Sequence, residues 1–426
     1  MKNETRVVIT GMGCITPNAN NVDEFKSSIE SGRSGIKHIP KLEELKFGCQ
    51  VGGECSGYEK RLEDTFLESE IDAMSEGMKM SSLAALEAFS MAQLKPKAED
   101  CDEVYEDTGA YIGTGIGGLD VFADWVYPNV EAKKVRRLGS SVVERIMCSG
   151  PSAKIAGLLG LGNHVSANSS ACSTGTEAVI MGLDRIRSGQ AKRMLVGGVE
   201  AAHPHIWAGF DAMRVLSRKF NDQPEQASRP MSASAAGFVP GSGAGVLVIE
   251  ELETALARKA PIIAEITGGA LTCGGMRLGG SMTAPSSRGV IRCIRQALSD
   301  AGMQGSDIDY INGHLTATMA DPIELGNWQR ALECQAEDVP YINSTKSMIG
   351  HSLGATGAIE TIATLLQMKY SFIHGSLNCN DLHPDIEPFA SKVVQETISK
   401  PINVAAKASF GFGDVNSCMI FKNWEG

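Results

Sequence analysis

The chain has 426 residues, of which 43% are hydrophobic and 21% are charged, as in an ordinary globular protein and unlike a disordered one. No apolar run approaches the roughly 20 residues that span a bilayer, so membrane insertion is not expected. The formal net charge of −11 argues against nucleic acid or an anionic membrane as the main partner. The length suits two to three domains or one large fused body.

The eleven cysteines are spread singly, and no CxxC pair occurs. This pattern fits neither a disulfide framework nor a metal site. The N-terminal sequence MKNETRVVIT has no long apolar core or small-residue cleavage site, so it does not resemble a signal peptide. These features predict a reduced, cytoplasmic protein that holds no metal.

The first half of the chain is expected to alternate strands with helices. Residues 6–13 (RVVITGMG) are typical of a buried strand, and residues 70–95 of a long amphipathic helix. Polar residues 217–230 predict a long surface loop. Residues 109–120 predict a strand followed by a Gly-rich turn, and residues 164–190 predict a strand, a small-residue turn and a helix. Residues 193–203 and 243–252 each predict a buried strand.

A similar pattern begins again near residue 260. Residues 261–271 (PIIAEITGGAL) correspond to 6–13, and residues 340–368 correspond to the strand, turn and helix of 164–190. Between and after them, residues 287–302 predict a helix, 309–318 a strand and turn, and 403–421 two strands around a Gly-rich turn. We therefore expect an α/β protein with an internal duplication, residues 1–260 and 261–426. The halves should pack into one body with mostly parallel sheets covered by helices.

The spacing of Gly113, Gly115 and Gly118 fits the G-x-G-x-x-G pattern of dinucleotide-binding turns. No ribose-binding acid closes a following strand–helix–strand unit, however. Dinucleotide binding is therefore not expected.

Cys172 is the most informative residue. It follows Ser169, Ser170 and Ala171, and it begins the helix expected after this turn. The positive end of a helix dipole and its free N–H groups favour thiolate, the nucleophilic form of cysteine. The alternative is that Cys172 is one more small buried hydrophobic residue.

His314 and His351 each follow an expected strand, in a turn of small residues. Equivalent strand ends of a duplicated body converge, so the His351 turn should meet the Cys172 turn. One histidine beside a cysteine could act as a base, whereas two suggest stabilisation of charge on a carbonyl oxygen. The alternative is that His314 and His351 are ordinary surface or core histidines. We interpret the remaining histidines in this way: His38, His164, His203, His205, His374 and His383.

Lys346 precedes His351 by five residues, and Glu324 follows His314 by ten. A buried pair of these two residues could fix the charge of the site. An exposed pair would contribute less than about 1 kcal/mol.

Taken together, these segments resemble the elongating β-ketoacyl-acyl carrier protein synthases, especially type II. The resemblance covers nearly the whole chain, through the stretches RVVITGMGCITPNANN, GTGIGGL, SSACSTGTEA, LVGGVEA, ASRPMSASAAGFVPGSGAGVLVIEE, INGHLTAT, NSTKSMIGHSLGATGAIE and SFGFGDVN. It implies a thiolase-like fold, in which two pseudo-symmetric α/β halves form a layered αβαβα body.

The resemblance also implies a role for each matching residue. Cys172 would accept the acyl group, and His314 and His351 would serve malonyl decarboxylation and condensation. Lys346 and Glu324 would form the supporting ion pair. The oxyanion hole would combine the N–H groups of Cys172 and of Phe412, the gating phenylalanine. Further positions are Ile116 and Phe410 for the acyl pocket, with Ile116 at a dimer interface, and Thr283 and Thr316 along the path of the pantetheine arm.

The resemblance implies an acidic acyl carrier protein as partner and no cofactor. Because this chain is itself acidic, docking requires a local basic patch. The densest basic run is Lys133, Lys134, Arg136 and Arg137, and Arg214 matches a carrier-docking arginine of the family. A solvated charged face is the alternative for the run. A homodimer is expected, with a heterodimer of related subunits as the other possibility.

The sequence departs from the family in two loops. The family's HGTST is here HLTAT, with Leu315 in place of glycine, Ala317 in place of serine and one residue missing before Asp321. The family's GFGGTN is here GFGDVN, with Asp414 in place of glycine. These changes keep the catalytic residue types, but they leave open an aryl-polyene or polyketide-like pathway beside fatty-acid elongation. We expect the two changes to compensate and reshape the gate; a surface-directed Asp414 is the alternative.

Three other assignments are weighed. A degradative thiolase would use a second cysteine near a C-terminal turn, where Cys418 stands, but the paired histidines argue against it. An initiating synthase would carry asparagine at position 351. A non-catalytic, chain-length-setting subunit of a heterodimer typically lacks the cysteine that is present here as Cys172.

Overall fold

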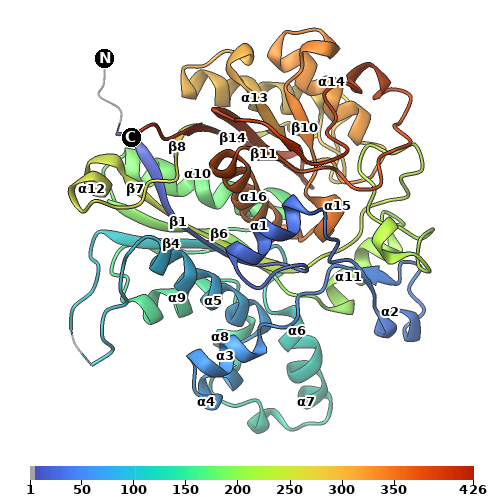
Figure 1. Ribbon diagram of the computed structural model, residues 1–426. Helices are drawn as coiled ribbons and strands as arrows, with labels where there is room; N and C mark the ends of the chain where they lie inside the picture. The colour runs from blue at the N-terminus through green and yellow to red at the C-terminus, as the bar shows by residue number, and fades with distance from the viewer. Residues whose placement is uncertain (1–4, 101) are drawn as a thin grey trace.

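The structure is a computed structural model that describes residues 5–100 and 102–426 (Figure 1). Residues 1–4, on which part of the signal-peptide argument rests, and Cys101 lie outside the described residues. The other ten cysteines are free thiols. None of the helices in these two ranges is long and apolar enough to cross a membrane.

One ten-stranded sheet runs through the molecule in the order β10-β9-β13-β14-β8-β1-β7-β6-β4-β5. Its strands are β1 (Val7–Ile15), β4 (Thr108–Gly113), β5 (Val165–Ser166), β6 (Arg193–Glu200), β7 (Gly243–Glu251), β8 (Ala264–Cys273), β9 (Tyr310–Asn312), β10 (Tyr341–Asn343), β13 (Val404–Gly411) and β14 (Val415–Asn423). Two short ribbons pair β2 (Lys37–His38) with β3 (Val51–Gly52), and β11 (Phe372–Ile373) with β12 (Ile398–Ser399).

The two halves of this sheet repeat one topology. Numbered within its half, each set of five strands has the order 3-2-4-5-1, and the halves join where β1 pairs with β8 over Val7–Ile9. The expected duplication is therefore present. The sheet is less parallel than expected, because in each half the fourth strand is antiparallel to the fifth and the fifth to the first. In the second half, β13 and β14 are joined by a tight turn, which forces an antiparallel pair.

Helices lie on both sides of each half-sheet and give the αβαβα layers (Figure 1). The outer layer of the first half contains α5 (Glu76–Met91) and α9 (Gly150–Leu159), and that of the second half α13 (Ser287–Ala301) and α14 (Asp321–Leu332). Between the half-sheets lie α10 (Thr174–Arg187) and α16 (Thr356–Tyr370). This middle layer belongs to the largest core cluster, with Val179, Leu183 and Ile362 among its fully buried members.

The remaining helices are short and lie mostly in insertions of the first half. They are α1 (Val22–Glu30), α2 (Pro40–Glu44), α3 (Glu59–Thr65), α4 (Glu68–Asp72), α6 (Leu119–Val121), α7 (Tyr127–Glu131), α8 (Val142–Ile146), α11 (Pro204–Ala212), α12 (Leu252–Ala257) and α15 (Lys346–Ile349). The single helix expected over residues 70–95 is divided into α4 and α5. The Ser75 side chain caps α5 by accepting the N–H of Met78, so a new helix begins there.

Two glycines bring the middle helices together near their N-termini. A Cβ atom at Gly175 would lie 2.7 Å from the backbone N of Ala358, and one at Gly357 would lie 2.4 Å from that of Thr176. Side chains at these positions would force α10 and α16 apart. The close crossing places the turns that precede the two helices next to each other, and those turns carry the candidate site.

Candidate active site

Cys172 lies in a one-turn 3₁₀ helix, Ala171–Ser173, directly before α10. Ala171 has a φ of +50°, in the left-handed region that side-chain-bearing residues rarely adopt. The turn before α16 repeats this geometry in Leu353–Ala355, where Leu353 has a φ of +46°. By this symmetry Cys172 corresponds to Gly354, and His351 corresponds to Ser169. The two strained turns aim the thiol and the imidazole at each other.

The structure brings Cys172 and His351 into contact. The Nε2 atom of His351 lies 3.1 Å from the Cys172 sulfur. On the other side of the ring, the backbone N–H of Leu353 donates to Nδ1 at 3.2 Å, and the Thr356 hydroxyl lies 2.8 Å from the same atom. Because Nδ1 accepts, the neutral ring carries its proton on Nε2. His351 therefore donates toward the sulfur.

His314 forms the third corner of the site. Its ring is perpendicular to that of His351, with centroids 5.4 Å apart, and it faces Phe410 at 6.1 Å. Its Nδ1 atom is buried without a hydrogen-bond partner among the described residues. Burial, followed by the charge of Lys346, holds the pKa of both imidazoles well below its usual value. Both rings are therefore neutral at pH 7.

The expected ion pair of Lys346 with Glu324 is wrong. Lys346 is buried, and its Nζ lies 2.6 Å from Oε1 of Glu360 on α16. Glu324 instead accepts the backbone N–H groups of His314 and Leu315, at 2.7 and 2.8 Å. Burial raises the pKa of Glu324 to about 7, against the effect of these hydrogen bonds. Glu324 thus positions the histidine turn.

A second lysine completes the charge cluster. The Nζ of Lys407, on β13, lies 2.9 Å from Oε2 of Glu360, so one carboxylate bridges two ammonium groups. All three side chains are buried. Burial lowers the pKa of Lys407, while Glu360 raises it. Two cations with one anion leave a positive field beside the imidazoles, which is why both lysines lower the histidine pKa values.

The pKa of Cys172 moves opposite to the expectation. Burial raises it to about 11, against the lowering effects of Lys346 and of the backbone N–H groups of Phe412 and Cys172 itself. Desolvation thus has a larger effect on the thiol than the helix N-terminus has. The same two N–H groups are the ones that the resemblance assigns to an oxyanion hole.

A cavity of about 620 Å³ opens onto this cluster. It brings together most of the residues expected from the sequence, and its lining includes Cys172, Arg214, Thr283, His314, Thr316, Glu324, His351, Phe410 and Phe412. Aromatic side chains narrow it beside the nucleophile, where the Phe210 ring lies 6.1 Å from that of Phe412. The cavity can hold an acyl chain next to Cys172.

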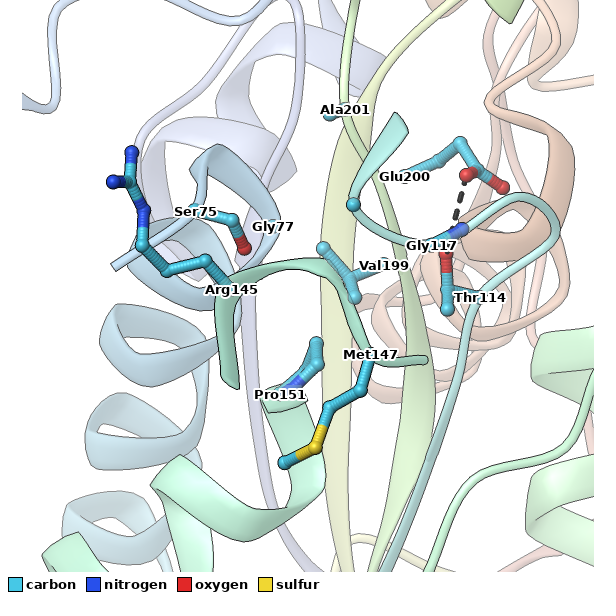
Figure 2. Close-up of a pocket in the computed structure, with 11 residues that line it drawn as sticks. Ser75, Gly77, Thr114, Gly117, Arg145, Met147, Pro151, Val199, Glu200 and Ala201 are labelled. Atoms are coloured by element: carbon cyan, nitrogen blue, oxygen red, sulfur yellow. Dashed lines mark hydrogen bonds between the residues drawn. The ribbon is translucent and has the colours of Figure 1, made fainter. Parts of the chain in front are cut away.

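Ile116 lies outside this cavity lining, on the turn after β4, with 38% of its surface exposed. Figure 2 shows this turn beside Glu200, whose carboxylate contacts the Thr114 hydroxyl at 3.2 Å. Glu200 also accepts the N–H groups of Gly115 and Gly354, at 2.8 and 3.0 Å. Burial raises the pKa of Glu200 to about 7. This carboxyl joins the Ile116 turn to the turn that follows His351.

The basic run is exposed and lies apart from the cavity. Lys133, Lys134, Arg136 and Arg137 follow α7, at the bottom of Figure 1, and form no ion pair within the described ranges. Arg214, in contrast, lines the cavity and is exposed at its edge. The structure therefore separates the two basic regions named from the sequence.

Asp414 is fully buried, so the surface-directed alternative is wrong. Its carboxylate accepts the N–H groups of Met276 and Ser286, each at 2.9 Å. Its φ of +58°, like the +22° of Leu315, lies on the left-handed side of the map, at a position where the family carries glycine. Leu315 and Asp414 thus keep a backbone conformation typical of glycine, and each adds a side chain at its position.

The thiol and the two imidazoles place three metal-binding atoms within 4.8 Å of one another. Such a set could hold a soft cation. The two buried lysines behind it oppose a metal cation by electrostatic repulsion.

Comparisons with known proteins found matches over most of the chain. The family described as "Beta-ketoacyl synthase, N-terminal domain" matches residues 4–255, and "Beta-ketoacyl synthase, C-terminal domain" matches residues 263–380. The "3-oxoacyl-[acyl-carrier-protein] synthase I, chloroplastic" of Arabidopsis thaliana is 37% identical, covering 98% of this chain and 86% of that protein. The "3-oxoacyl-[acyl-carrier-protein] synthase 2" of Synechocystis is 34% identical, covering 99% and 98%.

Two solved structures share the fold over 99% of this chain and 100% of theirs, with TM-scores of 0.86. "The ishigamide ketosynthase/chain length factor" is 29% identical in sequence. A ketosynthase in a complex titled "AntDE:AntF (apo): type II PKS acyl-carrier protein in complex with its ketosynthase bound to the hexaketide" is 27% identical.

Sequence reasoning missed three residues of the site: Thr356, Glu360 and Lys407. Thr356 and Glu360 are one helical turn apart, so they lie on the same face of α16, the helix that begins after the His351 turn. This spacing could have indicated them from the sequence. Lys407 stands in an otherwise small and apolar strand, VAAKASFG, and a charge in such a strand indicates a buried partner.

Proposed function

Because the chain belongs to the β-ketoacyl synthase family, we propose that it joins an acyl thioester on Cys172 to malonyl-carrier protein by decarboxylative Claisen condensation. The observation that carries this proposal is the contact of the Cys172 sulfur with Nε2 of His351, 3.1 Å apart, at a cavity that His314 also lines. The product is a β-ketoacyl thioester two carbons longer than the acyl substrate.

In the first half-reaction, the Cys172 sulfur attacks the carbonyl carbon of the acyl thioester. The new carbon–sulfur bond replaces the bond to the carrier's pantetheine sulfur, which leaves and takes the proton of Cys172. The N–H groups of Cys172 and Phe412 stabilise the oxyanion. Because His351 already carries its proton on Nε2, it stabilises the thiolate by donation rather than by removing the proton.

In the second half-reaction, the bond between the malonyl carboxylate and its methylene carbon breaks, and CO₂ leaves. The electron pair forms an enolate, whose oxygen accepts hydrogen bonds from His314 and His351. The methylene carbon then attacks the acyl-enzyme carbonyl and expels the Cys172 thiolate. The electrons balance without a metal or redox cofactor, so none is proposed.

A second copy of the chain, or a related subunit, completes the proposed assembly. The edge strand β5 is half exposed. Apolar side chains are also exposed on the segment from α6 to α7, where Phe122, Trp125, Tyr127 and Val130 are 40–57% exposed. Ile116 lies directly before this segment, which fits an acyl pocket closed by the partner. A reducing cytoplasm suits this chemistry, because Cys172 must stay a free thiol.

The pathway is proposed to be fatty-acid elongation or a related polyene or polyketide elongation. The departures at Leu315 and Asp414 support the specialised choice. Leu315 lies between the cavity-lining residues His314 and Thr316, and Asp414 follows the cavity-lining Phe412 by two residues. A non-catalytic role is disfavoured by the intact contact of Cys172 with His351.

The test is a condensation assay with an acyl-loaded and a malonyl-loaded carrier protein, with the products identified by mass spectrometry. We expect the product to be two carbons longer, and we expect Cys172→Ser to abolish it. Cys172→Gln, a neutral mimic of the acyl state, should still release CO₂ from malonyl-carrier protein without condensing. Condensation by Cys172→Ser above a few per cent of the wild-type rate would remove Cys172 as the nucleophile.

A further inference from the structure

One stretch of this acidic chain carries only positive charge. Residues 271–299 contain Arg277, Arg288, Arg292 and Arg295 and neither aspartate nor glutamate, although the net charge of the chain is −11. Three of these arginines lie on α13 at spacings of four and three residues. Such spacings place side chains on one face of a helix. None of these four arginines lines the active-site cavity.

The arginine face lines a groove between α13 and α14, the neighbouring helices at the top of Figure 1. The groove has a volume of about 620 Å³, and its lining comprises Leu278, Ser287, Arg288, Ile291, Arg292, Arg295, Gln296, Ser299 and Arg330. It is thus formed by four guanidinium groups with apolar surface between them. We call it the arginine groove.

Most of this charge is not neutralised. Arg292 donates to the carbonyl oxygen of Cys273, and Arg330 to the carbonyl oxygen of Gly326 and to the side chain of Asn327. Of the four arginines, only Arg295 pairs with a carboxylate among the described residues, that of Glu333, which is 75% exposed. The side chain of Arg288 has neither a hydrogen bond nor an ion pair within the described ranges. The groove therefore presents fixed positive charge to an anionic partner.

The arginine groove adjoins the mouth of the active-site cavity. Pro285 lines the cavity and Ser287 lines the groove, two residues apart, and on α14 the cavity-lining Asn327 lies one turn before Arg330. Apolar side chains are exposed along this border: Leu278 79%, Met282 59%, Ile323 54% and Met319 92%. Exposed apolar residues beside a charged rim are characteristic of a protein interface.

We propose that the arginine groove is a docking surface for an acidic face of the carrier protein that delivers the thioester to Cys172. This inference rests on the proposed function, and it places the carrier on α13 and α14 rather than on the basic run 133–137. Charge complementarity holds the carrier beside the cavity, and the apolar border contacts its surface. Its thioester arm then reaches Cys172 through the cavity.

The test compares two double charge reversals of equal size, Arg288→Glu/Arg292→Glu and Lys133→Glu/Lys134→Glu. The probe is a fluorescently labelled, holo type II acyl carrier protein, and its dissociation constant is measured by anisotropy at low and high NaCl. Loading of Cys172 by a small acyl-pantetheine thioester is measured on the same proteins. This second readout requires the cavity and the nucleophile but not the groove.

We expect Arg288→Glu/Arg292→Glu to weaken carrier binding at least about tenfold at low salt and to flatten its salt dependence, because rim charges act through screened electrostatics. Loading by acyl-pantetheine should stay at the wild-type rate. Unchanged carrier binding in this variant, or weakening only in Lys133→Glu/Lys134→Glu, overturns the proposal. Failure of the wild-type protein to be acylated by either substrate would instead contradict the proposed function.

Discussion

The two histidines face Cys172 in different ways, and this difference predicts different defects. Removing either one deletes a donor to the enolate oxygen, which costs about 3–4 kcal/mol, or roughly 10²–10³ in the rate of malonyl decarboxylation. Acylation of Cys172 should survive better than decarboxylation in both His314→Ala and His351→Ala. It should fall further in His351→Ala, because only His351 contacts the sulfur.

Stopped-flow CO₂ release and intact-mass kinetics measure the two half-reactions separately. Wild-type condensation by His314→Ala would show that the altered HLTAT loop has removed this residue from the chemistry. Equal acylation defects in the two variants would contradict the distinct role of His351.

Lys407 should control how acid affects stability. Burial, followed by the charges of Lys346 and Lys407, disfavours protonated His314 and His351, so their folded pKa values lie well below that of an unfolded histidine, near 6.5. Below pH 6.5 the unfolded chain therefore binds more protons, and stability falls as the pH falls toward the folded pKa values. Lys407→Met should raise those folded pKa values, so the difference between the folded and unfolded pKa values becomes smaller.

We therefore expect Lys407→Met to lose less unfolding free energy between pH 7 and pH 5.5 than the wild type loses. Urea titrations at both pH values measure this, with Lys422→Met on β14 as the matched control. The other charged groups of the cluster, Lys346, Glu360 and Glu324, are present in every protein compared. If Lys407→Met loses as much unfolding free energy between these pH values as the wild type, Lys407 does not affect the pKa values of the imidazoles.

At the scale of the elements, Asp414 ties the gate to the segment before α13. Its carboxylate holds the N–H groups of Met276 and Ser286, and it follows Phe412 by two residues. Asp414→Gly frees both segments while allowing the positive φ. We expect this variant to load a different range of acyl chains onto Cys172 and to decarboxylate malonyl-carrier protein almost normally. Both readouts come from one panel of acyl-carriers, and an unchanged acyl preference would separate Asp414 from gating.

The elements that hold the site were largely predictable from the sequence. The Ser/Thr/Gly turns before α10 and α16 stood out because small residues interrupt apolar periodicity, and the duplication indicated that they converge. The partner of Lys346 was not predictable in this way. Glu324 and Glu360 are both buried acids near the site, and only the packing of α16 beneath the His351 turn decides between them.

The pKa of Cys172 was missed for a related reason. A helix N-terminus is visible in a sequence, whereas the depth at which a thiol is buried depends on the whole fold. Here desolvation is the larger effect. The sequence similarly placed Asp414 beside the gate, but it does not show which N–H groups the carboxylate reaches across the molecule.

At the scale of the whole molecule, the exposed apolar segment of α6 and α7 predicts association. Tyr127→Glu/Val130→Glu should convert a dimer into monomers, because two charges would be buried in the interface. Light scattering coupled to size exclusion measures the mass, and Leu256→Glu, on the equally exposed α12 surface, is the control. A mass unchanged from the wild type in the double variant would place the interface elsewhere.

The central claim is that Cys172 carries the growing chain, and its most direct test is to locate the acyl group. The protein is incubated with an acyl-loaded carrier protein without malonyl substrate, and intact and peptide masses are recorded. One acyl group per chain is predicted, on the peptide that contains Cys172, and none on Cys172→Gln. It should disappear when malonyl-carrier protein is added, as the longer β-ketoacyl product forms. An acyl group on another residue, or one that persists after this addition, would contradict the account.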